Sequence, residues 1–299
     1  MRRTVALALA GVALAGCCRA GAAARPYTPA ELAAVADEQR ARGGAGFASA
    51  IVSPFVVVGN GGVDAVRADA QVVAWARDLL KRDFFEHDPG VILTIWSFPD
   101  ESSYRSGASA VFGSVPSTPY GYYSPCRRAL VMNVGYGYGT MVHEIVHAFM
   151  DASFSAAPVW FHEGLGSLFE APSCVDERGV EDADLGCAAR GHIRGRVNWR
   201  LHALQRALAS GTAPSWERMA DAGRFAFDGK DGPLLYSAAR YTLYWLQEKG
   251  LLLRYFRAFQ RDQDRDPGGL ATLREVLGGG ALAAQRAEWE RFVAALRGP

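Results

Sequence analysis

The spacing of apolar residues changes part-way along the chain, from short strand-like runs mixed with helical spacing to helical spacing alone. Before residue 139, runs rich in Val, Ile and Phe and bounded by turn residues predict three strands, at residues 49–58, 91–98 and 128–134. Helices are predicted at residues 28–42 and 66–85, where apolar residues recur at helical spacing. The order of these elements predicts a mixed sheet with helices crossing over it.

Local signals support the ends of some of these elements. Thr28 is a suitable N-cap, with Pro29 at the first helical position and Glu31 three residues after the cap. Asp100 is expected to cap a further short helix. Residues 116–125 are rich in Tyr, Gly and Pro, and this composition predicts a loop.

From residue 139 onward the pattern is almost wholly helical. Helices are predicted at residues 139–152, 158–170, 198–209, 233–250, 252–262 and 281–297. The whole pattern predicts an α+β fold, in which a sheet subdomain (residues 28–138) precedes a mainly helical subdomain (residues 139–299).

The first residues have the features of an export signal. Arg2 and Arg3 precede an apolar run at residues 5–15, which is too short to span a bilayer as a permanent helix. The end of the run, Leu14-Ala15-Gly16-Cys17, resembles the bacterial lipobox, in which the Cys thiol carries diacylglycerol. We therefore predict a lipoprotein signal peptide at residues 1–16 and a tether at residues 17–27. The resemblance implies a chain exported and lipid-anchored at Cys17, facing the periplasm or the cell exterior; the alternative is an ordinary cleaved leader.

Composition and charge narrow the classes of partner. Of the 299 residues, 49% are hydrophobic, which is enough for a full-sized core. Lys and Arg together number 32 and Asp and Glu 31, so the chain has no basic excess. This balance argues against nucleic acid as the main partner.

Three cysteines lie beyond the leader junction, and an exported protein meets an oxidising compartment. Cys174 and Cys187 flank an acidic, Gly-containing stretch, and we predict that a disulfide between them closes this loop. The alternative is a disulfide from Cys126 to either one. Zinc binding by these thiols is not expected, because they lack the close spacing of zinc-binding cysteine pairs.

One motif with metal-binding spacing lies where the sheet half meets the helical half. His143, Glu144 and His147 form His-Glu-x-x-His within an apolar, helical stretch. Residues four apart share a helix face, so both imidazoles can address one ion, and Glu144 can reach a water on it. This arrangement suits Zn²⁺. The alternative is a helix with two hydrogen-bonded surface histidines and a salt-bridging Glu.

The residues that follow the motif resemble the sequence of a known family of zinc enzymes. The stretch Trp160-Phe161-His162-Glu163-Gly164-Leu165-Gly166 fits the Trp-x-x-Glu-Gly-Leu-Gly phrase of gluzincin (peptidase MA-like) zinc metallopeptidases. The resemblance covers residues 128–170. It implies a zincin-like fold with the active-site helix at the junction, and Glu163 as third zinc ligand; His162 is the alternative ligand. The family often has an acid at the position of Ser167 to orient a zinc-bound His, so here another group or water must do so.

The resemblance also implies a mechanism. Zinc would activate a water molecule, and Glu144 would act as general base. Tyr236 is the candidate for stabilising the oxyanion, although it could simply be a packing residue on an aromatic-rich helix. His192 and His202 are weaker candidates that we expect at the surface. The strand at residues 128–134 resembles the edge strand on which zincins bind an extended peptide; the alternative is an ordinary core strand.

The leading hypothesis is therefore a zinc metallopeptidase that acts on peptides or proteins. One alternative is a zinc-stabilised, non-catalytic envelope lipoprotein that serves as a scaffold or binding module. Another is a zinc hydrolase that acts on a different bond. Glu144 favours an enzyme, because a structural zinc site has no need of a base beside the metal.

Overall fold

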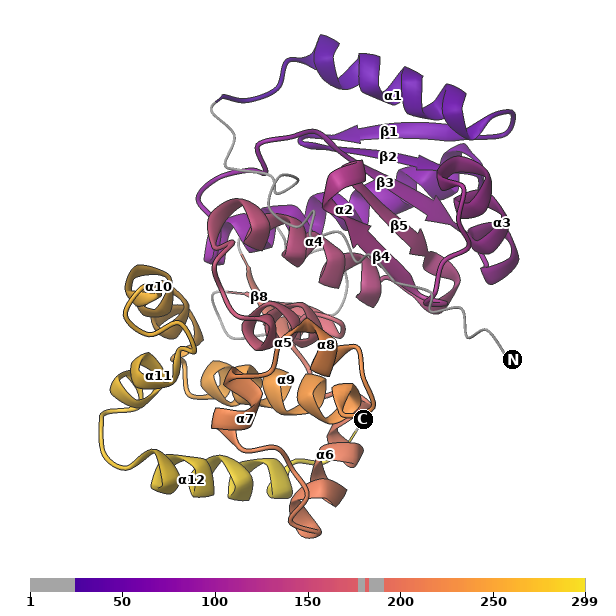
Figure 1. Cartoon of the computed structure of the whole chain (residues 1–299). Coiled ribbons are helices and arrows are strands. Elements are labelled where there is room, and N and C mark those ends of the chain that lie inside the picture. The colour runs from indigo at the N-terminus through magenta and orange to yellow at the C-terminus, as the bar shows by residue number, and fades with distance from the viewer. Residues whose placement is uncertain (1–24, 177–180, 183–190, 299) are drawn as a thin grey trace, which may run out of the picture.

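The structure of this protein is a computed structural model that describes residues 25–176, 181–182 and 191–298 (Figure 1). The predicted signal peptide, Cys17 and Cys187 lie outside the described residues. The predicted α+β class is confirmed, with a mixed five-stranded sheet in the first half and mostly helices in the second. No helix of the described chain is long and apolar enough to cross a membrane.

The first half is built on a sheet in the order β1-β2-β3-β5-β4. The three central strands β2, β3 and β5 are parallel, and β1 and β4 are antiparallel edges. The strands are β1 (Ala48–Val52), β2 (Phe55–Gly59), β3 (Leu93–Phe98), β4 (Gly121–Ser124) and β5 (Ala129–Asn133). Parallel neighbours need crossover helices, and α2 and α3 supply them as the sequence predicts.

Side chains alternate between the two faces of the strands, so each face has its own helical cover. Phe55 and Val57 pack in the large core with α2 (Val63–Asp83) and α4 (Gly139–Ser153). Val56 and Val58 face the opposite way, toward α1 (Pro29–Gly43) and α3 (Glu101–Phe112). The helix that carries the His-Glu-x-x-His motif therefore lies on the sheet face that looks toward the helical half (Figure 1).

Three predictions in the sheet half are wrong. The strand predicted at residues 49–58 is an antiparallel hairpin, because Ser53 and Pro54 turn the chain between β1 and β2. Proline has no N–H to donate to a ladder and so favours such a break. Residues 121–124, predicted as part of a loop, form the edge strand β4. The strand at residues 128–134 is therefore not the edge, because β5 lies between β3 and β4.

The second half contains the predicted long helices and several short elements that were not predicted. The helices are α5 (Val159–Leu168), α6 (Arg200–Ala209), α7 (Trp216–Ala220), α8 (Arg224–Phe227), α9 (Gly232–Glu248), α10 (Leu252–Asp262), α11 (Leu270–Val276) and α12 (Leu282–Ala295). A small sheet contains β6 (Pro172–Val175), β7 (Glu181–Asp182) and β8 (His192–Gly195). Of these elements, the small sheet and α7, α8 and α11 were not predicted. Two 3₁₀ turns, at Pro125–Arg127 and Val134–Tyr136, belong to the first half.

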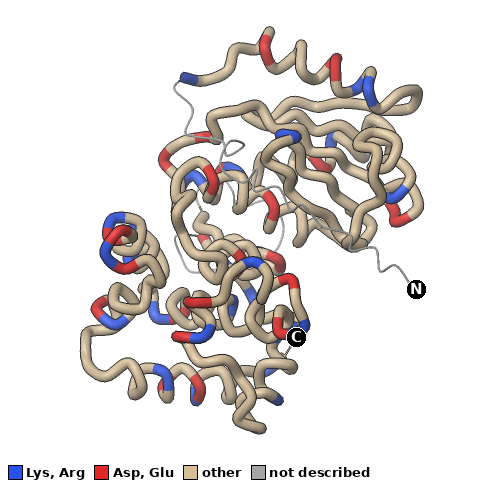
Figure 2. The backbone as a smooth tube through the Cα atoms, in the orientation of Figure 1, with Lys and Arg blue, Asp and Glu red and all other residues tan. Residues whose placement is uncertain are grey.

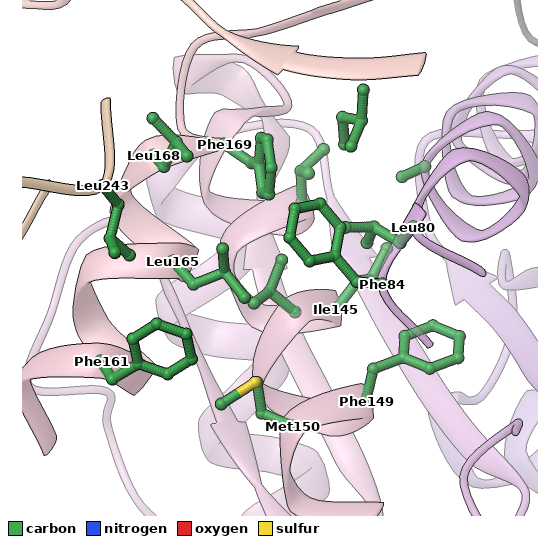
Figure 3. Packing of buried hydrophobic residues seen from close by; sticks show 14 of the residues in the cluster. Leu80, Phe84, Ile145, Phe149, Met150, Phe161, Leu165, Leu168, Phe169 and Leu243 are labelled. Atoms are coloured by element: carbon green, nitrogen blue, oxygen red, sulfur yellow. The ribbon is translucent and has the colours of Figure 1, made fainter. Parts of the chain in front are cut away.

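The two halves share one continuous hydrophobic core. Figure 3 shows Ile145, Phe149 and Met150 of α4 lying close to Phe161 and Leu165 of α5. The same core extends to the helix α2 on one side and to α9 and α10 on the other. Acidic and basic residues are interspersed along the chain rather than gathered by sign (Figure 2). The metal motif is thus fixed on both sides by packed apolar residues.

Candidate metal centre

The helix α4 presents both histidines of the motif on one face. The side chain of His143 is 9% exposed and that of His147 is 13% exposed, and their ring centroids are 4.6 Å apart. The neighbours Ile145 and Val146 are fully buried in the shared core, which fixes the rotation of α4 about its axis. The imidazoles are therefore held together, one turn apart, away from bulk water.

The next helix, α5, brings Glu163 to the same point. Its Oε2 atom lies 3.3 Å from Nε2 of His143 and 3.5 Å from Nε2 of His147. Ligand atoms of these three residues lie within 4.8 Å of one another, and among the described residues no other trio of metal-ligating side chains meets in this way. Two imidazole nitrogens and one carboxylate oxygen are a common protein ligand set of catalytic zinc sites, so the residues fit this metal.

Two glycines of the phrase around Glu163 allow α5 to approach so closely. A Cβ on Gly166 would lie 2.9 Å from the His143 ring, too close for a real contact. A Cβ on Gly164 would lie 3.2 Å from Ala239 on α9. The helix α5 thus packs against His143 on one side and α9 on the other, with the closer contact at Gly166.

His143 is held from behind by Glu170, which the sequence reasoning missed. Nδ1 of His143 lies 3.2 Å from Oε1 of Glu170, just beyond the end of α5. Arg200 donates two hydrogen bonds of 2.8 Å to the same carboxylate, and Asn198 donates a longer one. Nδ1 donates to Glu170, so Nε2 of His143 is directed toward Glu163, where it would bind a shared ion. This is the role left open at Ser167, whose side chain is buried elsewhere in the core.

The charges at this site are strongly coupled. Burial lowers the pKa of His143, but hydrogen bonds with Glu163 and Glu170 outweigh this effect and raise the pKa to about 10. Burial raises the pKa of Glu163, but the neighbouring histidines hold it well below its usual range. For Glu170, hydrogen bonds from His143 and Arg200 likewise outweigh burial, and the pKa is about 2. The two carboxylates therefore remain charged, and Glu163 favours a cation beside the two histidines.

His162 is the alternative third ligand, and it lies outside the trio. It lines the same cavity, with its ring centroid 6.0 Å from that of His147. Adjacent residues on a helix point about 100° apart, so Glu163 and His162 cannot both face the two histidines squarely. The geometry thus places Glu163, and not His162, against both imidazoles.

No family model matches the chain, and a search of curated proteins finds no match.

A cavity of about 660 Å³ opens onto the cluster. Glu144 and Tyr236 both line it, as do residues of the edge strand β4. Glu144 follows His143 on α4 and is not one of the trio of ligand residues. The cavity is large enough to admit part of a peptide beside the metal ligands and Glu144.

Tyr236, predicted to stabilise an oxyanion, lies in this cavity close to Glu163. Burial raises the pKa of Tyr236, and the nearby negative charge of Glu163 raises it further, so the hydroxyl keeps its proton. The ring is stacked under the Arg200 guanidinium at 5.1 Å and packs edge-on against Phe227 at 5.2 Å. Tyr236 is thus positioned as a neutral hydrogen-bond donor.

Arg224 also reaches the cluster and was not predicted. It starts the four-residue helix α8, and its Nη1 donates a short hydrogen bond to Oε1 of Glu163. The sequence around it has no motif that marks this contact, because the residues are 61 positions apart. Only the path of the chain through α7 and α8 brings them together.

The remaining sequence candidates lie apart from the cluster. His192 has a side chain that is 60% exposed and pairs with Asp83 at 2.7 Å, and His202 is exposed on α6. Cys126 and Cys174 are each disulfide-bonded. The predicted partner Cys187 lies outside the described residues, so the predicted pairing stays a prediction.

Proposed function

We propose that this protein is a zinc metallopeptidase in which His143, His147 and Glu163 hold the metal and Glu144 is the general base. The observation that carries the proposal is the approach of the three ligand residues at the base of a cavity that Glu144 also lines. When bound, the zinc ion would supply Lewis acidity that lowers the pKa of a water molecule and polarises the carbonyl under attack.

The chain's own residues account for proton transfer and charge stabilisation. Glu144 takes a proton from the attacking water and delivers it to the leaving amine, as a carboxylate at hydrogen-bonding distance of both can do. Tyr236 donates a hydrogen bond to the oxygen on which negative charge develops. Its raised pKa supports this role, because a neutral hydroxyl donates.

The edge strand β4 supports a peptide as substrate. It pairs with β5 along one side, and Gly121, Tyr122 and Tyr123 line the cavity. An extended peptide can add to such an edge through main-chain hydrogen bonds, which select for a polypeptide whatever its side chains. We propose that the substrate lies along β4, with one peptide bond above the metal ligands.

The shape of the site favours an enzyme over a zinc-stabilised scaffold. Structural zinc sites are usually closed by four protein ligands, whereas catalytic sites use three and leave a position for water. The trio of ligand residues and the adjoining cavity match the second kind. We propose further that the enzyme is anchored to the envelope by lipid on Cys17, because of the resemblance of residues 14–17 to a lipobox.

The experiment that tests the function is Glu144→Gln. The substitution keeps the shape of the side chain and removes its basicity, so we expect about one zinc ion per chain in both proteins and the loss of cleavage of an unfolded protein substrate in the variant. Glu217→Gln, at an exposed position on α7, is the matched control and should cleave like the wild type. A Glu144→Gln protein as active as the wild type would overturn the proposal.

A further inference from the structure

Arg224 is placed to do more than neutralise Glu163. Its side chain is 54% exposed and lines the cavity, while the Glu163 side chain that it contacts is only 3% exposed. The guanidinium thus bridges the buried cluster and the open space in which a substrate would lie. A residue that served only to hold Glu163 would have no need to remain so accessible.

The contact with Glu163 leaves the metal-facing oxygen free of Arg224. Oε2 of Glu163 faces His143 and His147, whereas Oε1 accepts from Nη1 of Arg224. One of the five N–H donors of a guanidinium is used in this bond. The position already accommodates one carboxylate, and the accessible part of the guanidinium can accept a second.

The other arginine of the cavity differs in this respect. Among the described residues that line the cavity, Arg200 and Arg224 are the two arginines, and none is a lysine. Arg200 is 20% exposed, directs both Nε and Nη2 to Glu170, and covers the ring of Tyr236. Its donors are therefore committed to positioning His143, and Arg224 is the cation that faces the cavity.

Acidic side chains also line the cavity. Asp151 and Asp228 are two of them, and they would repel a negatively charged substrate group. Arg224 and the proposed zinc ion would attract such a group. Carboxylates are the groups that a guanidinium binds with matched, two-pronged geometry.

We propose that Arg224 binds a carboxylate of the peptide substrate next to the scissile bond, either the C-terminal carboxylate or an acidic side chain, and thereby sets specificity. The proposal rests on the zinc peptidase function given above. It makes Arg224 a substrate-binding residue, distinct from Glu170 and Arg200, which act through His143.

The test measures binding without cleavage, in the zinc-loaded full chain carrying Glu144→Gln. The probes are two pairs of otherwise identical alanine peptides, one pair with a free or an amidated C-terminus and one pair with a central Glu or Gln, with affinity measured by calorimetry. We expect the parent protein to prefer the charged member of at least one pair, and the pair that shows the preference identifies the source of the carboxylate. Adding Arg224→Gln should weaken binding of that charged peptide by about 10- to 100-fold and leave its neutral partner unchanged, because a hydrogen bond to a charged group is lost.

A control variant and the zinc content of the parent protein distinguish failure of this inference from failure of the proposed function. Arg218→Gln is the control. Arg218 lies on the neighbouring helix α7 and forms an exposed ion pair with Asp231, so this substitution should change none of the affinities. If Arg224→Gln weakened the binding of charged and neutral peptides equally, Arg224 would only hold Glu163. If the parent protein bound all the peptides with equal affinity, it would have no preference for a carboxylate. Either result overturns this inference and leaves the proposed function standing. A parent protein that binds no zinc would contradict the proposed function itself, and this inference with it.

Discussion

Glu170 determines which nitrogen of His143 faces the other ligand residues. It accepts from Nδ1 of His143 and is itself held by two hydrogen bonds from Arg200. Glu170 lies just beyond the end of α5 at Leu168, and its carboxylate contacts His143 on the opposite side of the ring from Glu163. An acid close behind Glu163 is visible in the sequence, but its contact with His143 depends on the turn that ends α5, and the contribution of Arg200 comes from a different helix.

Replacing Glu170 with Gln should weaken zinc binding. The variant keeps a hydrogen-bond acceptor for His143 but loses the charge that balances Arg200, and outer carboxylates of this kind typically change metal affinity by about 10- to 100-fold. Competition with a chromophoric chelator measures the change. Glu248→Gln, which removes an ion pair with Arg194 away from the cluster, is the control. Unchanged zinc affinity in Glu170→Gln would show that Glu170 has no influence on the metal.

At the scale of elements, long periodic segments were predictable and short ones were not. The helices α2, α4, α5, α9 and α10 follow from apolar spacing sustained over several turns. The edge strand β4, with only four residues, was hidden in a stretch rich in Tyr and Gly. The helix α8 is equally short, so its position depends on tertiary contacts such as Arg224 with Glu163. The parts missed from the site, β4 and Arg224, belong to these short elements.

The buried carboxylate of Asp69 connects α2, β3 and the start of α4 through hydrogen bonds. Asp69 of α2 accepts hydrogen bonds from Ser97 of β3 and from Tyr138, which immediately precedes α4. Burial raises the pKa of Asp69 above the ordinary value of 3.8, although the two hydrogen bonds oppose the shift. The native state therefore holds this proton more tightly than the unfolded chain does.

Stability should consequently depend on pH through Asp69. Because its folded pKa is raised, the stabilisation is complete below the unfolded pKa of about 4 and is lost as pH rises through the folded pKa. Asp69→Asn cannot titrate, so its free energy of unfolding should rise relative to that of the wild type as pH increases over this window. Denaturant unfolding at a series of pH values measures the difference. Asp64→Asn, at an exposed position on the same helix, should leave the wild-type profile unchanged, and parallel profiles for Asp69→Asn and wild type would refute the assignment.

In the whole molecule, the proposed metal ligands lie where the sheet meets the helical part of the chain. His143 and His147 come from α4, which covers the sheet, and Glu163 comes from α5, the next helix along the chain. A single core surrounds both helices, so the distance between the ligands is set by the packing of the entire fold (Figure 1). The sequence predicted this junction because the motif itself falls where strand-like spacing ends, whereas the packing that closes the site depends on contacts far apart in the chain.

X-ray absorption at the zinc edge of the purified wild-type protein reports the proposed metal ligands themselves. We expect about one zinc ion per chain, with two imidazole nitrogens and with oxygen donors completing the shell, all at about 2.0–2.2 Å. Oxygen is expected from Glu163 and from solvent. A spectrum with a third imidazole, with sulfur at about 2.3 Å, or with no bound zinc would contradict the assignment of His143, His147 and Glu163 as the metal ligands.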